Sequence, residues 1–201
     1  EVEEQLKLDP SNVELLQKKQ KLFSEAIQET EKKLETLRIA EKQVQQQFQE
    51  GKVSQEQYDS LKSKIAATEK SLKQLEKQAG KSELDTIRQS LSSANKELRS
   101  TQSQLNDVNR LLKLDPSNTE LLQQKHKLLA KSVEEIKKKL DLLKEAEKQV
   151  EQQFKEGKTS QEQYDAIKRE IIATEQALEN LEDQAADSNV ALQKIGQAGE
   201  K

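Results

Sequence analysis

Several residue types that support common chemistries are missing from this chain of 201 residues. It contains no cysteine, which excludes disulfide bonds, thiolate zinc sites and cysteine nucleophiles. Its single histidine, His126, leaves little material for metal ligation or for acid–base catalysis. Methionine is absent too, even at the first position, so we expect the chain to be a piece of a longer protein.

Apolar and aromatic residues are scarce. Hydrophobic residues make up 32% of the chain and aromatic residues 2%, whereas charged residues make up 35%. This hydrophobic content is too low for a thick globular core. No apolar run approaches the roughly 18 residues of a membrane span, and no signal peptide is recognisable. This composition suits either disorder or long helices with narrow apolar seams, and periodic apolar residues would favour helices.

The charges are balanced and interspersed. The 34 basic and 37 acidic residues give a net charge of −3, without the basic surplus that a nucleic-acid site needs. Spacings of four residues, as in Glu134–Lys138 and Glu135–Lys139, indicate ion pairs on solvated helix faces. The run of three lysines at 137–139 is flanked by acids, so we interpret it as part of a solvated face. We therefore predict no catalytic, cofactor-binding or metal site, no small-molecule substrate, and a protein that is not an enzyme.

The chain contains a long internal repeat. The string LKLDPSNVELL at Leu6–Leu16 returns as LKLDPSNTELL at Leu112–Leu122, a shift of 106 residues. Roughly three in five positions agree between residues 6–79, here named copy one, and residues 112–185, copy two. This agreement indicates a tandem duplication of a unit of 106 residues.

A first pair of turns is predicted at 9–12 and 115–118. Proline pushes the preceding residue out of the helical conformation, so a helix should end before it. Aspartate can cap the next helix and proline can occupy its first position. The residues concerned are Asp9, Pro10, Asp115 and Pro116.

A second pair of turns is predicted at 51–54 and 157–160. Glycine allows a left-handed helix stop, and the serine three residues later can form a capping box with the glutamine that follows it by three. The glycines and serines are Gly51, Ser54, Gly157 and Ser160. An aromatic residue flanks each turn on both sides, and we expect these four to pack at the closed end of a helical hairpin: Phe48, Tyr58, Phe154 and Tyr164.

The apolar residues between the turns follow a heptad pattern, as expected of coiled-coil seams. In copy two the seam runs from Leu122 to Phe154 and from Tyr164 to Ala185. His126 lies in this seam where copy one has Gln20, and we interpret it as a polar residue that sets the register of the helices.

A helix break is predicted at the end of copy one. Ala79-Gly80 interrupts the heptad phase and Ser82 with Asp85 supplies a new capping pattern, so a third helix is predicted over about 82–114. Copy two has Ala186 in place of Gly80 and should remain helical. The seam from Leu84 to Leu112 needs a partner, which predicts a trimer or another small homo-oligomer unless the hairpins cover it within one chain.

The predicted fold is all-α, with long antiparallel coiled-coil hairpins joined by long helices. We expect a first repeat unit at 1–81, a connecting helix and second repeat unit at 82–186, and a helical extension at 187–201 that leads into a longer amphipathic region. Residues 1–8 look like the end of a connecting helix before copy one.

Three strings resemble the N-terminal helical region of phage tail tape measure proteins from siphophages and prophages of Gram-positive bacteria. They are VNRLLKLDPSN, the hairpin word EGKxSQEQYD and the closing LQKIGQAGEK, and the likeness extends over nearly the whole chain. The duplication departs from the family, in which one such unit is expected.

The resemblance implies a structural protein that fills the tail tube, sets tail length during assembly and leaves at genome ejection. It also implies the tail tube protein, tail-tip proteins and tail assembly chaperones as partners, with location in the virion tail and, during assembly, in the host cytoplasm. The same physics would suit a cellular coiled-coil spacer or adaptor of spectrin-like or chromosome-structure type. A peptide-binding helical repeat scaffold is the third reading, although the period of 106 differs from the tetratricopeptide period of about 34.

Overall fold

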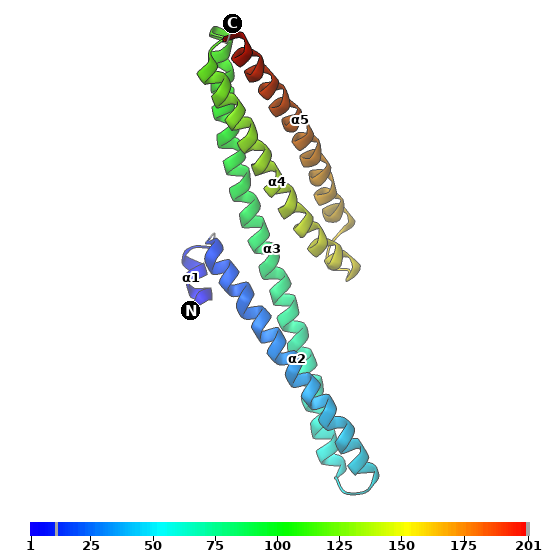
Figure 1. Cartoon of the computed structure of the whole chain (residues 1–201). Helices are drawn as coiled ribbons and strands as arrows, with labels where there is room; N and C mark the ends of the chain where they lie inside the picture. Colours follow the sequence, from blue (N-terminus) through cyan, green and yellow to red (C-terminus); the bar gives the residue numbers. More distant parts are fainter. Residues whose placement is uncertain (11, 200–201) are drawn as a thin grey trace. The chain divides into compact units, whose positions relative to one another are not determined.

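The computed structural model describes residues 1–10 and 12–199, with side chains up to Ile195. These residues form five helices and no strand. Figure 1 labels each helix. The helices are α1 (Val2–Leu8), α2 (Val13–Gln49), α3 (Gln55–Leu114), α4 (Thr119–Lys155) and α5 (Gln161–Gly199). The predicted all-α class with long helices is confirmed. The chain divides into unit 1, Glu1–Thr86, and unit 2, Ile87–Lys201.

Asparagine, not aspartate, begins the long helices after the proline turns. The Oδ1 atom of Asn12 accepts a hydrogen bond from the backbone N–H of Leu15 at 3.0 Å, and Asn118 does the same for Leu121 at 3.0 Å. The prediction that aspartate caps and proline opens these helices is therefore wrong. Asparagine directly precedes the first helical residue, so its short side chain reaches the third amide, which an aspartate three positions earlier cannot do.

The two aspartates instead directly follow the preceding helices, Asp9 after α1 and Asp115 after α3. Asp9 is the residue that ends α1, with φ −134° and ψ 84°. The carboxylate of Asp115 accepts hydrogen bonds from the Ser117 hydroxyl and the Asn118 side-chain amide, both at 3.2 Å. Ser11, within the predicted turn at 9–12, lies outside the described residues. The sequence thus predicts where these turns lie. It does not predict which side chain caps the helix that follows each turn.

Helix α3 continues through Gly80 for 60 residues, so the predicted break at Ala79-Gly80 is wrong. The Thr86 hydroxyl donates to the backbone carbonyl of Ser82 at 3.0 Å, a contact typical of a helix interior. A glycine inside a helix costs only about 1 kcal/mol, less than the hydrogen bonds and packing that a break would forfeit. The predicted third helix therefore does not begin at Ser82, and the two units divide inside a continuous helix.

Unit 1 is a hairpin of α2 and the first part of α3, with the short α1 beside α2 (Figure 1). Val2 of α1 and Leu16 of α2 are buried, and the Lys19 ammonium lies 3.2 Å from the Glu3 carboxylate. Apart from these contacts, α1 adds little to the hairpin because it has only seven residues.

Unit 2 packs three helical segments together: α3 from Ile87 onward, α4 and α5. One buried cluster joins all three segments, with Leu105 and Val108 from α3, Leu129 from α4, and Leu181 packed against them from α5. A second cluster nearer the hairpin end is built around Leu140, Leu143 and Ile171, with Leu91 of α3 against it. Much of the seam between Leu84 and Leu112 is thus covered within the chain, which is the alternative to a homo-oligomer that the sequence left open.

Candidate functional sites at the hairpin ends and seams

The glycine turns form the same helix-ending motif in both hairpins. Gly51 and Gly157 have φ of 72° and 69°, the left-handed conformation that a side chain disfavours. In unit 2 the N–H of Gly157 donates to the Phe154 carbonyl at 2.9 Å, and the N–H of Lys158 donates to the Gln153 carbonyl at 2.8 Å. These two bonds satisfy carbonyls that a helix end leaves unpaired, as in a Schellman motif. The predicted left-handed stops are confirmed.

Reciprocal hydrogen bonds start the return helix of each hairpin. The backbone N–H of Ser54 donates to Gln57 Oε1 at 3.0 Å, and the N–H of Gln57 donates to Ser54 Oγ at 3.2 Å. Ser160 and Gln163 form the same pair, with both distances at 3.2 Å. The predicted capping boxes are confirmed, so each hairpin turn is fixed from both sides by local sequence.

Aromatic rings close the end of each hairpin. Phe48 and Tyr58 stack with ring centroids 5.3 Å apart, and Phe154 and Tyr164 repeat this geometry at 5.3 Å. The Lys168 ammonium lies 4.3 Å from the centre of the Tyr164 ring. The pKa of Lys168 is raised above its ordinary value, chiefly by its side-chain interaction with that tyrosine. The expected packing role of the four aromatic residues is confirmed.

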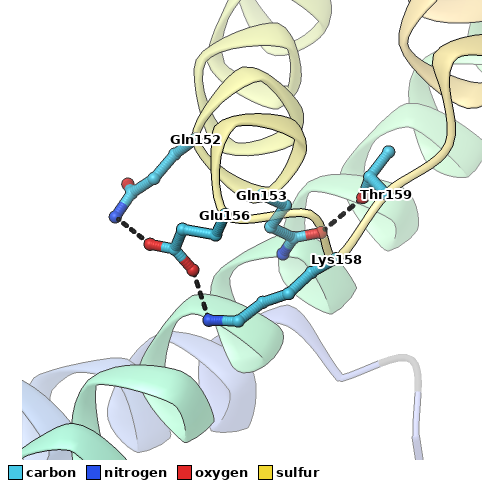
Figure 2. Close-up of polar contacts among 5 residues, drawn as sticks. All are labelled: Gln152, Gln153, Glu156, Lys158 and Thr159. Carbon is cyan, nitrogen blue, oxygen red and sulfur yellow. Dashed lines mark hydrogen bonds and ion pairs between the residues drawn. The ribbon is translucent and has the colours of Figure 1, made fainter.

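A polar network surrounds the turn of unit 2, as Figure 2 shows. The Gln152 amide donates to Glu156 Oε1 at 3.3 Å, and the Lys158 ammonium pairs with the other carboxylate oxygen of Glu156. The interaction with Lys158, followed by that with Gln152, lowers the pKa of Glu156. The Thr159 hydroxyl donates to Gln153 Oε1 at 3.2 Å. Copy one has Val53 in place of Thr159, and valine has no hydroxyl to donate.

Ion pairs across the hairpins distinguish the two copies. In unit 2, three lysines of α4 pair with carboxylates of α5. The pairs are Lys137–Glu182 at 2.8 Å, Lys139–Glu170 at 3.3 Å and Lys144–Glu175 at 3.2 Å. Copy one keeps the third pair as Arg38–Glu69 at 2.9 Å. At the positions of the other two it has like charges, and the residues are Glu31 with Glu76 and Lys33 with Lys64.

One carboxylate lies in the interior of unit 2. Glu135 is 5% exposed and its Oε1 accepts a hydrogen bond at 3.0 Å from the hydroxyl of Thr101, a fully buried residue of α3. Lys131 Nζ lies 3.6 Å from the same oxygen, and Oε2 has no hydrogen-bond partner. The predicted surface pair of Glu135 with Lys139 is therefore wrong, since Lys139 reaches across to Glu170. The heptad phase of α4 places residue 135 on the side that faces α3, and this phase could have predicted that Glu135 is buried.

Two further features of the described residues are the single histidine and a groove. His126 is half-buried in the seam and its Nδ1 has no hydrogen-bond partner. A shallow groove on unit 1 is lined by Glu31, Leu34, Glu35, Arg38, Ile39 and Lys42. Within the described part of the chain, no cluster of three or more potential metal ligands occurs. None of the helices in that part combines the length and apolar character needed to cross a membrane.

The arrangement as a whole joins helices to helices. Its built features are hairpin ends, seams, cross-helix ion pairs and one buried hydroxyl–carboxylate contact, all of which fix the register of neighbouring helices. Comparison with protein-family models, with curated proteins and with solved structures gives no match for this chain.

Proposed function

We propose that this chain is a structural, non-catalytic coiled-coil segment of a phage tail tape measure protein. The observation that carries the proposal is the set of three strings, VNRLLKLDPSN, EGKxSQEQYD and LQKIGQAGEK. Structural support comes from their positions, because the first leads through a turn to the asparagine cap and the second forms a complete hairpin end. The third lies at the end of α5, with residues 200–201 outside the described range.

The proposed role is to help fill the lumen of the tail tube, to take part in tail assembly and length determination, and to leave when the genome is ejected. Helices suit this role because each residue adds 1.5 Å, so that α3 is about 90 Å long. Their outer faces carry interspersed charges of both signs, which favour sliding past a tube wall over adhesion to it. The implied partners are the tube protein, the tail-tip proteins and the assembly chaperones.

The hairpins argue for a compact part of the measuring protein. A period of 106 residues would extend about 160 Å as one straight helix. The chain reverses at Gly51 and Gly157, and each reversal has a glycine stop, a capping box and a ring stack. Straightening a hairpin would forfeit all of these contacts together with the seam. We therefore propose that this region is a folded head on the ruler.

The test deletes one period of 106 residues in frame from the full-length protein. Tail length is then measured by electron microscopy, and both the wild-type protein and the shortened protein are sought in purified tails by mass spectrometry. A folded head predicts that the protein remains in the tail and that the tail shortens by much less than about 160 Å. Absence of the wild-type chain from purified tails would overturn the proposal, and shortening by the full length would overturn the folded head alone.

A cellular coiled-coil spacer or adaptor of spectrin-like or chromosome-structure type is the second candidate. The observation that favours it is α3, which continues from a hairpin into a three-segment bundle and so joins two helical units through one helix. Genes for tube and tail-tip proteins beside this one would favour the tail role. A cytoskeletal or chromosomal complex purified with the intact protein would favour the spacer.

A further inference from the structure

Equivalent faces of α2 and α4 differ greatly in exposure. Leu128 of α4 is 8% exposed, whereas Leu22, its counterpart 106 positions earlier in α2, is 49% exposed. In α2 the buried residues are Leu16 and Leu34. In α4 they are Leu128, Leu129, Ser132, Glu135, Ile136, Leu140, Leu143 and Ala146. Unit 1 thus has a helix face that its own elements leave largely uncovered.

In unit 2 the equivalent face is covered by α3. Leu105 and Val108 of α3 belong to the same buried cluster as Leu128 and Leu129 of α4. In unit 1 the counterpart of α3 is α1, which matches residues 108–114 and therefore omits the part that begins at Ile87. Val2 corresponds to Val108, and both are buried, at 9% and 4% exposure. The short α1 therefore takes the place and direction of a third helix and covers one end of the face.

The hydroxyl–carboxylate contact of unit 2 defines the chemistry that the open face would recognise. Thr101 is 0% exposed and donates to Glu135. Glu29 is the counterpart of Glu135 in α2, and it is exposed. A helix lying on α2 as α3 lies on α4 would place a side chain opposite Glu29, and a hydroxyl there would satisfy the carboxylate as it leaves water.

We propose that the face of α2 containing Leu22, Ala26 and Glu29 is a docking surface for a single amphipathic helix that continues the line of α1. The partner is defined by the segment that covers the equivalent face of unit 2. It carries apolar residues at the spacing of Ile87, Leu91, Ala94, Leu98 and Leu105, and a hydroxyl residue at the position of Thr101. This surface does not depend on the proposed tail role.

The experiment supplies such a helix to the full chain. The sequence of residues 86–106 is joined directly before Glu1, which places it in register because Glu1 corresponds to residue 107. Hydrogen exchange is measured at each backbone amide. We expect amides of α2 between residues 22 and 40 to exchange at least roughly tenfold more slowly than in the original chain. Amides of unit 2 serve as the internal standard that the rest of the protein is native.

Two control grafts make the result specific. One has glutamine at the positions equivalent to Leu91, Leu98 and Leu105, and it should give no protection because the apolar seam is lost. The other has valine at the position equivalent to Thr101, and it should give intermediate protection because Glu29 would lose its hydroxyl donor. Equal exchange in the original graft and the glutamine graft would overturn the proposal.

Light scattering separates this partner from a second copy of the chain. We expect the ungrafted protein to have the same mass with and without the substitution Leu22→Glu. A dimer that Leu22→Glu converts to a monomer would show that a second copy covers the face, and would overturn the proposal of a single amphipathic helix in line with α1.

Discussion

At the residue scale, Gly157 should be sensitive to substitution for conformational reasons alone. A Cβ atom built on this residue meets nothing within 4 Å, so the positive φ is the obstacle. We expect Gly157→Ala to destabilise unit 2 by about 1 kcal/mol, measured as the free energy of unfolding in urea. An unchanged midpoint would contradict the left-handed conformation.

Gly80 provides the matched control because it lies inside α3. Copy two has Ala186 at the equivalent position, within α5. We expect Gly80→Ala to stabilise the protein by roughly 0.5–1 kcal/mol, since alanine loses less backbone freedom than glycine on folding into a helix. Destabilisation on the same urea assay would instead support a helix break at this point.

The carboxylate of Glu156 gives the hairpin end of unit 2 a pH dependence. Its pKa is lowered in the folded protein, first by Lys158 and then by Gln152. The associated stabilisation is therefore present above the pKa of the unfolded chain and is lost as pH falls through the lower folded pKa. In an NMR titration we expect Lys158→Gln to raise the pKa of Glu156 toward its ordinary value. An unchanged pKa would show that Lys158 is not the dominant cause.

At the scale of elements, exchanging charges in unit 1 should strengthen its hairpin. Glu31→Lys would face Glu76, and would reproduce the Lys137–Glu182 pair of unit 2. Because these positions are solvent-exposed, we expect a gain of about 0.2–1 kcal/mol at low salt that decreases as salt is added. Urea denaturation at two salt concentrations measures it.

A double-mutant cycle isolates the contact from other effects of the new lysine. Glu76→Gln combined with Glu31→Lys should remove most of the gain, whereas Glu76→Gln alone should be mildly favourable because it relieves a like-charge contact. In unit 2, Lys137→Glu should have the opposite sign. If the gain persists without Glu76, it arises within α2 and not across the hairpin.

The success of sequence reasoning at this scale follows the range of the interactions. The hairpin ends were predictable because the contacts described for Gly157, Ser160 and Tyr164 lie within about ten residues along the chain. The break at Gly80 was predicted wrongly because a local cost was outweighed by packing on both sides. The four-residue spacing to Lys139 predicts a surface ion pair for Glu135, whereas its hydroxyl donor, Thr101, lies 34 residues away on another helix.

At the scale of the whole molecule, the two units should differ in stability despite their similar sequences. In unit 2 the third segment of the bundle is a long part of α3, whereas in unit 1 the third segment is only α1, with seven residues. We expect backbone amides around Leu22 to exchange with solvent at least roughly tenfold faster than those around Leu128. Hydrogen exchange followed by mass spectrometry compares the two directly. Equal rates would indicate that the face of α2 is already covered in solution.

The short loops at Gly51 and Gly157 have a consequence for how the chain folds. Because the copies are so alike, α2 could in principle pair with α5: this would set Lys33 beside Glu170, although Glu31 would meet Glu182. Charge alone therefore does not strongly reject the exchanged pairing. Closing a loop of a few residues costs far less chain entropy, and is far faster, than closing one of more than a hundred. The glycine turns thus act as kinetic guides that pair each helix with its neighbour before the duplicated partner can compete.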